Sequence, residues 1–219
     1  MKIPSEGGWT FESEEIASGF DKHVREQLPW YDLATNAVAH IARHYLPDNG
    51  TLYDIGASTG NITVALSETI AARKIKVFAV EPSKEMAAKY KGAGLLTKQK
   101  AEDVFYESFD VAVIFLTMMF IPVKKRKSFL ENLLANLNEG GCIIIFDKTP
   151  PAGGYLGTIL YRLTLAGKIA AGVSGDEVVK KELSLAGRQI PYSCDIEGAK
   201  EVFRFGDFVG WVIESPKGK

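Results

Sequence analysis

The sequence has little cysteine, and neither sign of charge dominates it. Two cysteines, Cys142 and Cys194, cannot form a disulfide framework, and Cys142 lies in an apolar run where a buried free thiol is expected. The chain has 26 basic and 27 acidic residues, which leaves a formal net charge of −1. A protein that binds nucleic acid by itself needs a clustered basic surface. The balance therefore argues against nucleic acid as a partner unless a second protein supplies the contact.

Long apolar runs are also missing. No stretch approaches the roughly 20 apolar residues needed to cross a bilayer, and the N-terminal segment lacks the apolar core of a signal peptide. We therefore expect no membrane contact and a reducing compartment, the cytoplasm. Of the 219 residues, 46% are hydrophobic and 24% are charged. This composition excludes disorder over most of the chain and fits one domain with a modest lid.

The middle of the chain alternates short apolar runs with amphipathic segments. The apolar runs are expected to be strands and cover residues 52–55, 76–80, 109–116 and 142–147. The amphipathic segments are expected to be helices and cover residues 14–28, 32–46, 61–72, 83–91 and 123–137, with a turn at 138–141. Continuous apolar strands that alternate with helices predict an α/β fold, in which helices cover both faces of a parallel sheet.

The two ends of the chain follow a different pattern. Residues 1–12 are rich in glycine, proline and serine, and we expect them to be poorly ordered. Two helical patterns, 154–171 and 175–187, follow one another without a strand between them. The strand-like runs 200–205 and 208–214 are separated by only two residues, which predicts a β-hairpin.

A strand that ends in a glycine-rich turn carries the main functional signal. Asp54 lies near the end of this strand, and Gly56 and Gly60 bracket the turn that opens the next helix. Glycine lets the backbone approach a ligand closely, and the first N–H groups of a helix are free donors. The carboxylate of Asp54 favours a ligand with an ammonium group over one with phosphates. The Gly-x-Gly-x-x-Gly pattern of pyrophosphate sites is absent.

Glu81 adds a second signal at the end of the next strand, 21 residues after Gly60. An acidic side chain at this place can accept both hydrogen bonds of a ribose diol. Taken alone, the glycines are compatible with a tight turn and Glu81 with a neighbour of a helix cap. Together they predict a nucleoside-containing ligand at the carboxyl ends of the strands.

In this order, these features resemble the class I S-adenosylmethionine-dependent methyltransferases. The resemblance rests on the Asp-x-Gly-x-x-x-Gly turn, Glu81, the segments 101–103, 109–113 and 138–141, and the C-terminal hairpin. It implies a Rossmann-like, seven-stranded and mostly parallel sheet whose last strand is antiparallel. It also implies an N-terminal helical cap and a helical lid after the fifth strand.

The resemblance further implies S-adenosyl-L-methionine as the cofactor. In the family the glycine turn holds the methionine part, the acidic residue at Glu81 holds the ribose, and the segment Ala101–Asp103 flanks the adenine. Lys100 stands where many members have an aspartate, which passes the contact with the adenine amino group to Glu102, to Asp103 or to the backbone. By this likeness the cofactor-binding residues are Tyr31, Asp54, Gly56, Ala57, Ser58, Gly60, Glu81, Pro82, Ala101, Glu102, Asp103 and Phe115.

The resulting organisation is one domain with four parts. Residues 1–46 form the N-terminal tail and helical cap, and residues 47–151 form the cofactor-binding core. Residues 152–190 form the lid, and residues 191–219 form the hairpin that completes the core sheet.

Within the superfamily, the chain resembles the carboxy-S-adenosylmethionine synthases, which act in tRNA wobble-uridine modification. The likeness places Tyr31 over the cofactor. It lies in Phe20-Asp21, Val24 and the segments 28–31, 116–120, 147–148, 172–174, 180–181 and 205–206. That group has a further helix whose arginine holds an extra carboxylate of the cofactor, and the segment 192–198 is too short for it. Arg162, Arg188 and Arg204 are the alternatives for this contact. The group also has an asparagine where this chain has Phe115.

No motif identifies a catalytic group. The weak candidates are Tyr31, His23 and Tyr155. His40 and His44 have the helical spacing of two metal ligands, but no third ligand is evident, so we expect a solvated helix flank and no metal. The basic run 124–127 is expected to be a solvated face.

The leading hypothesis is a methyltransferase that acts on a small molecule beneath an apolar lid. The alternatives are an enzyme like the carboxy-S-adenosylmethionine synthases and a cofactor-binding scaffold without catalysis. The same apolar lid also suits a homodimer interface. Its apolar residues within 14 positions are Leu160, Leu163, Leu165, Ile169 and Val173.

Overall fold

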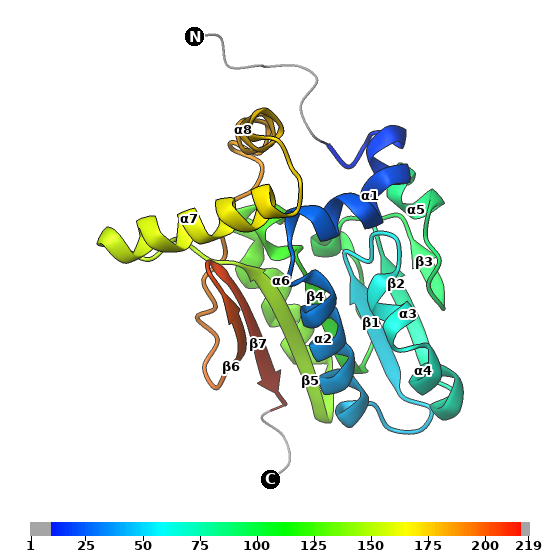
Figure 1. The fold of residues 1–219 in the computed structure, drawn as a ribbon. Coiled ribbons are helices and arrows are strands. Elements are labelled where there is room, and N and C mark those ends of the chain that lie inside the picture. Colours follow the sequence, from blue (N-terminus) through cyan, green and yellow to red (C-terminus); the bar gives the residue numbers. More distant parts are fainter. Residues whose placement is uncertain (1–9, 216–219) are drawn as a thin grey trace.

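The computed structural model describes residues 10–215, which build a seven-stranded sheet with helices on both faces (Figure 1). The strands are β1 (Thr51–Ile55), β2 (Lys76–Val80), β3 (Leu95–Thr97), β4 (Phe109–Phe115), β5 (Leu137–Lys148), β6 (Lys200–Phe205) and β7 (Phe208–Glu214). Their order in the sheet is β3-β2-β1-β4-β5-β7-β6. Strands β1 to β5 pair in parallel, whereas β7 is antiparallel to both β5 and β6. The predicted Rossmann-like sheet with an antiparallel last strand is confirmed.

The helices are shared between the two faces of the sheet. They are α1 (Glu14–Gln27), α2 (Tyr31–Tyr45), α3 (Asn61–Ala65), α4 (Ser67–Arg73), α5 (Lys84–Ala88), α6 (Val123–Asn136), α7 (Gly154–Ala170) and α8 (Gly175–Ser184). Two 3-10 turns are η1 (Ala101–Asp103) and η2 (Met118–Phe120). Helix α2 packs on β4 and β5 from one side, and α6 packs on β5 from the other (Figure 1).

Alternate side chains of the central strands fill two separate cores. The core on the α2 side includes Ala34, Val38, Val111, Val113 and Ile144. The core on the α6 side includes Ala112, Ile114, Phe129, Leu133 and Ile143. Successive side chains of a strand point to opposite faces, so a strand buried on both faces must be apolar throughout. This explains the continuous apolar runs in the sequence.

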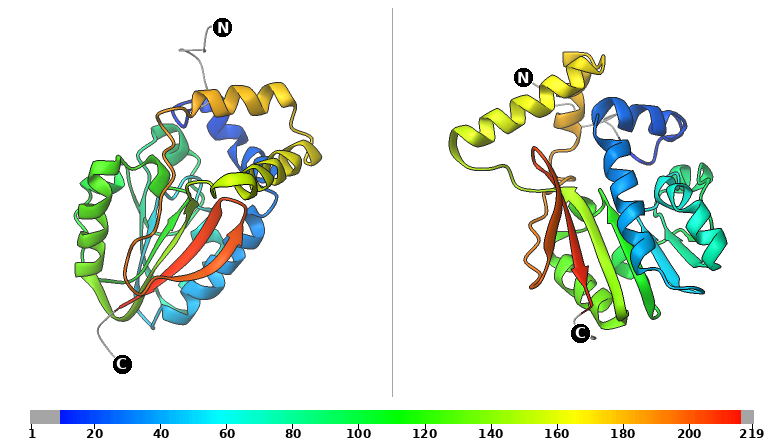
Figure 2. Two further views of the ribbon diagram at one scale, coloured as in Figure 1. Left: turned by 90° about the vertical axis from the view of Figure 1, so that its left-hand side faces the viewer. Right: turned by 60° about the horizontal axis from the view of Figure 1, so that its bottom comes forward.

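Helix α1 and the lid, which consists of α7 and α8, lie across the carboxyl ends of the parallel strands (Figures 1 and 2). Ser13 caps α1 by accepting from the N–H of Ile16 at 3.4 Å, and Ser174 caps α8 by accepting from the N–H of Glu177 at 3.2 Å. Helix α7 contacts both α1 and α8. Cap and lid therefore meet above the sheet edge that carries the glycine turn.

One predicted turn is wrong. Residues 138–141 belong to β5, which begins at Leu137. Gly140, with φ of +77°, lies where the pairing with β4 shifts register between Phe109 and Val111. The turn-forming residues predicted a break before the strand. In the structure, β5 includes them and continues through an irregularity in its pairing.

Smaller differences concern short elements. The predicted helix 61–72 is two helices, α3 and α4, and the helices predicted at 83–91 and 175–187 end earlier, at Ala88 and Ser184. The sequence pattern does not predict β3, because its three residues are partly exposed at the sheet edge and carry no apolar run. Of the residues expected to be poorly ordered, 1–9 lie outside the described part of the chain.

Candidate functional site

The glycine turn, from Gly56 to Gly60, joins β1 to α3 at the carboxyl edge of the sheet. Gly56 and Gly60 have φ of +75° and +92°, a region that favours glycine. The N–H of Gly56 donates to the carbonyl of Val80 at 2.8 Å, which holds the turn against β2. A Cβ on Gly56 would collide with the side chain of Thr117, and one on Gly60 would lie 2.6 Å from the backbone nitrogen of Gly92. The close packing of the turn therefore requires glycine at both positions.

Two buried carboxylates lie beside this turn. Asp54 is 1% exposed, and its Oδ2 has no hydrogen-bond partner among the described residues. Burial, and then the charge of Glu81, raise the pKa of Asp54 to about 7. Burial also raises the pKa of Glu81, although hydrogen bonds from the N–H groups of Ser83 and Ser58, both at 2.9 Å, oppose the shift. A buried carboxylate oxygen without a partner fits a ligand that brings an ammonium group.

Asp21 ties α1 to the glycine turn. Its Oδ1 accepts from the hydroxyl of Thr59 at 2.6 Å and from the amide of Asn61 at 3.0 Å. Burial alone would raise the pKa of Asp21, but these hydrogen bonds, together with the ammonium group of Lys91, outweigh it and hold the pKa below its ordinary value. The attachment positions the face of α1 that carries His23 and Gln27 toward the strand ends.

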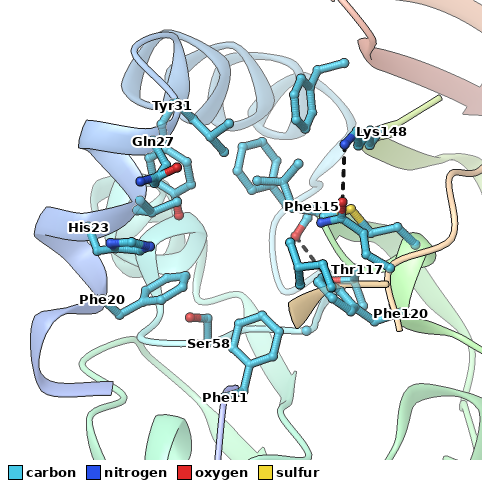
Figure 3. Close-up of a pocket in the computed structure, with 18 of the residues that line it drawn as sticks. Phe11, Phe20, His23, Gln27, Tyr31, Ser58, Phe115, Thr117, Phe120 and Lys148 are labelled. Atoms are coloured by element: carbon cyan, nitrogen blue, oxygen red, sulfur yellow. Dashed lines mark hydrogen bonds between the residues drawn. The ribbon is translucent and has the colours of Figure 1, made fainter. Parts of the chain in front are cut away.

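A cavity lies between the glycine turn, α1 and the lid (Figure 3). His23 and Gln27 border it from α1, and Lys148 borders it from the end of β5 on the opposite side in Figure 3. Gln27 is 2% exposed, and neither its side-chain nitrogen nor its oxygen has a hydrogen-bond partner within residues 10–215. Buried amides are normally paired, so a polar ligand would complete this wall.

The cavity brings together most of the residues that the family resemblance indicated. Those that line it are Tyr31, Asp54, Gly56, Ala57, Ser58, Glu81, Pro82 and Phe115. Gly60, Ala101, Glu102 and Asp103 are not among the lining residues, and Asp103 pairs with Lys125 at 2.8 Å. Of the catalytic candidates, His23 and Tyr31 line the cavity, whereas Tyr155 is 72% exposed at the start of α7 and does not.

Three lysines that the sequence analysis assigns no role also line the cavity. They are Lys148 at the end of β5, Lys168 in α7 and Lys181 in α8. Lys168 is 6% exposed and donates to Glu182 at 2.9 Å. Lys148 and Lys181 lie in segments of the family resemblance, and Lys168 stands out as a lysine within the apolar helix 154–171. Only tertiary packing brings the three together.

Two other candidates lie elsewhere. The rings of His40 and His44 contact each other with centroids 4.9 Å apart, and no group of three or more metal-binding side chains occurs in residues 10–215. In the basic run 124–127, the expected solvated face is wrong for Arg126, which is buried and donates to the carbonyls of Ile190 at 2.6 Å and Pro191 at 3.0 Å. The guanidinium of Arg126 thus pairs with backbone carbonyls in the segment that follows the lid. The sequence around Arg126 gives no sign of these long-range contacts.

None of the helices in the described part of the chain combines the length and the apolar character that crossing a membrane requires.

Comparison with known proteins identifies a similar domain over the core of the fold. Residues 53–143 match the family model described as a methyltransferase domain. This segment contains the glycine turn, Glu81 and strands β2 to β4.

The similar curated proteins extend the likeness beyond that core. A carboxy-S-adenosyl-L-methionine synthase from Staphylococcus epidermidis is 26% identical over 217 residues, which cover 92% of this chain and 95% of that protein. A protein of the same name from Shewanella sediminis is 26% identical over 196 residues, with coverages of 85% and 81%.

Solved structures show the same fold. A putative S-adenosyl-L-methionine-dependent methyltransferase from Methanococcus maripaludis covers 98% of both chains with a TM-score of 0.58 and 15% identity. The plantazolicin methyltransferase BpumL, in complex with SAH, covers 80% of this chain and 62% of its own with a TM-score of 0.53 and 16% identity.

The matched methyltransferase domain and the shared fold confirm the predicted resemblance to the class I S-adenosyl-L-methionine-dependent methyltransferases. Within the class, the chain resembles the carboxy-S-adenosyl-L-methionine synthases over nearly its whole length.

Proposed function

We propose that the protein transfers the methyl group of S-adenosyl-L-methionine to a small molecule bound beneath the lid. One observation carries this proposal: one continuous cavity joins the carboxylates of Asp54 and Glu81 to side chains of α1, α7 and α8. A cofactor at the strand ends and an acceptor under the lid would share this space, as direct transfer between them requires.

The cofactor would occupy the part of the cavity formed by the strand ends, here named the strand half. Asp54 would bind its ammonium group, the glycine turn its methionine part, and Glu81 its ribose hydroxyls. Tyr31 and Phe115, whose ring centroids are 5.4 Å apart, form the apolar wall beside the turn. When bound, the cofactor supplies a methyl group that the sulfonium already activates. The chain itself then mainly has to align the acceptor and exclude water.

A small acceptor is favoured over a nucleic acid because α1 and the lid cover the strand ends (Figure 2). The charge of the basic run 124–127 is partly compensated. Lys125 pairs with Asp103, Arg126 is buried, and Lys127 pairs with Glu131 at 3.9 Å. A cytoplasmic location is supported by the two cysteines, which are both free.

Calorimetry with S-adenosylhomocysteine and a methyl-transfer assay test the proposal. We expect a dissociation constant in the micromolar range and transfer of labelled methyl from S-adenosyl-L-methionine to a small-molecule fraction of a cell extract. Failure to bind at millimolar ligand would contradict the proposal. Binding without any transfer would instead support a scaffold without catalysis.

A carboxy-S-adenosyl-L-methionine synthase-like activity is the second candidate. It is favoured by the name that the similar proteins share and by their coverage of up to 92% of this chain. Against it, the described chain forms no helix between Ser184 and Lys200 that could carry the arginine of that group. Mass spectrometry of the nucleoside that remains bound through purification separates the two, since the carboxylated cofactor is heavier by one carbon dioxide.

We also propose a homodimer formed through the outer face of α7. The helix carries two stripes of side chains: one lines the cavity, and the other is exposed. The cavity stripe consists of Tyr161, Thr164, Leu165 and Lys168. The exposed stripe consists of Leu156, Ile159 and Leu163, which are 56%, 44% and 44% exposed. Apolar side chains grouped on one exposed helix face favour contact with another protein surface.

A further inference from the structure

The part of the cavity beneath α7 and α8, here named the lid half, differs from the strand half in its charge. We propose that the acceptor is an organic anion whose anionic group is bound by Lys148, Lys168 and Lys181, with its apolar body against α1 and the lid. The inference rests on the proposed function, because it names the chemical class of the acceptor for the same site.

Three segments bring the ammonium groups together around one space. Lys148 is the last residue of β5, Lys168 lies in the last turn of α7, and Lys181 lies in α8. Burial, and then the charge of Lys168, lower the pKa of Lys181 to about 8, and Lys148 contributes to the shift. Lys168 and Lys148 therefore repel Lys181. Glu182 and Glu177 partly offset this repulsion, and a bound anion would offset it further.

The neighbours of these lysines leave room for an anionic ligand. Lys148 donates to the neutral side-chain amide of Gln189 at 3.4 Å (Figure 3). The ammonium of Lys181 lies 2.9 Å from Nε2 of His23, whose pKa burial lowers to about 4, so the ring is neutral near pH 7. Lys168 is paired with Glu182. The hydrogen bond to the neutral amide of Gln189 orients Lys148 without cancelling its charge, whereas Glu182 and Glu177 partly offset the charge of Lys181.

Gln27 supplies an independent observation. Its side-chain amide is buried against the cavity and has no hydrogen-bond partner among the described residues. The NH₂ group of Gln27 could donate to an anionic oxygen, which would satisfy a buried donor that is otherwise costly. The wall around it is apolar, with Phe20, Leu165 and Leu185 among the lining residues. An anion with an apolar body matches both properties.

The distribution of charge also orients the two ligands. The strand half carries Asp54 and Glu81. The lid half carries the three lysines with Glu182, which pairs with Lys168, and Asp207, so that lysines outnumber carboxylates there. A cationic cofactor and an anionic acceptor would therefore each meet charge of opposite sign, and would attract each other across the cavity. A cationic acceptor would instead add to the repulsion among the lysines.

Binding of matched ligand pairs tests the inference. A panel of aliphatic and aromatic carboxylates, each paired with its primary amide, is titrated by calorimetry into the protein with and without S-adenosylhomocysteine. We expect the carboxylates that bind to do so at least about tenfold more tightly than their amides. Lys148→Gln should remove this preference, because it deletes the charge and keeps a polar side chain of similar shape, whereas Lys148→Arg should retain it.

Lys127→Gln is the matched control, since Lys127 lies on α6 with its side chain 88% exposed and should leave the preference unchanged. The inference is overturned if no carboxylate in the panel binds better than its amide, including the case in which none binds. It is also overturned if Lys148→Gln retains the preference. Measuring the affinity for S-adenosylhomocysteine in the same samples distinguishes failure of this inference from failure of the proposed function. Loss of cofactor binding contradicts the proposed function, while loss of carboxylate preference alone contradicts only this inference.

Discussion

The backbone N–H of Ser58 donates to Oε2 of Glu81 at 2.9 Å, so that one carboxylate joins the glycine turn to the end of β2. The other oxygen of Glu81 accepts from the N–H of Ser83, also at 2.9 Å. The side chain is buried and its direction is fixed before a ligand arrives. A site that is already ordered loses less conformational entropy on binding, which favours affinity.

This arrangement makes Glu81 the first target for mutation. We expect Glu81→Ala to weaken S-adenosylhomocysteine binding by about tenfold to a hundredfold, since hydrogen bonds to a charged group are worth about 1.5–3 kcal/mol. Glu81→Gln keeps one acceptor oxygen and should lose less. Glu131→Gln, on the exposed face of α6, serves as the control. Calorimetry would contradict the ribose role if Glu81→Ala bound as tightly as this control.

The close packing of Gly56 in the glycine turn can be tested by mutation, with Gly140 as a control of similar backbone conformation. Gly56 and Gly140 both have positive φ, but a Cβ meets Thr117 at Gly56 and nothing within 4 Å at Gly140. Gly140→Ala should cost about 1–2 kcal/mol of stability from conformation alone. Gly56→Ala should cost more and also weaken cofactor binding, because Thr117 must move. Thermal unfolding and calorimetry measure both effects, and equal losses in the two variants would contradict the steric argument.

The more drastic substitution Gly56→Arg should abolish cofactor binding, because a long side chain cannot fit at the turn. His40→Ala should leave binding intact, since His40 is exposed on α2 and does not line the cavity. Titration of S-adenosylhomocysteine into both variants separates a local effect from a general one. Comparable losses in the two would show that the turn is not the binding element.

Asp54 makes cofactor binding depend on pH. Its carboxyl must be ionised to pair with an ammonium group, and its pKa in the free protein is about 7. S-adenosylhomocysteine should therefore bind more weakly as pH falls below about 7, by up to about tenfold per pH unit. Asp54→Asn should bind weakly and nearly independently of pH between about pH 6 and pH 8. A wild-type affinity that is flat across this range would exclude Asp54 as the ammonium partner.

The same carboxyl should affect stability in the absence of ligand. Its pKa rises from the ordinary 3.8 to about 7 on folding, so the folded state keeps a proton that the unfolded chain releases. The contribution to the free energy of unfolding is fully present below about pH 4 and is lost as pH rises to about 7. Asp54→Asn removes this dependence and should be more stable than the wild type at about pH 8. Denaturant unfolding of the two proteins at about pH 4 and about pH 8 measures this difference in the free energy of unfolding.

The exposed stripe of α7 predicts the oligomeric state. A double substitution, Leu156→Glu with Ile159→Glu, should convert a dimer to a monomer in sedimentation velocity, because it places charge in an apolar interface. Cofactor binding should persist, since neither residue lines the cavity. The control is Val202→Glu on β6, which is 45% exposed and lies outside α7. A wild-type protein that sediments as a monomer would contradict the proposed dimer.

Much of the fold could be predicted from local patterns. The strands at 76–80, 200–205 and 208–214 match β2, β6 and β7 residue for residue. These segments are rich in β-branched and aromatic residues, and only Gly206 and Asp207 separate the last two, so sequence and structure give the same boundaries. The split between α3 and α4 and the continuation of β5 through Gly140 were not predictable, because they depend on packing and strand pairing rather than on propensity.

The residues of the strand half could be predicted from local sequence. Asp54, the glycine turn and Glu81 follow two successive parallel strands, and parallel strands bring their carboxyl ends to the same edge. The composition of the lid half depends on tertiary structure. Lys148, Lys168 and Lys181 come from three segments with no shared motif, and the packing of α7 against α1 and α8 encloses them with Gln27. Their charge around one cavity is a property of long-range contacts, which no local pattern of the chain records.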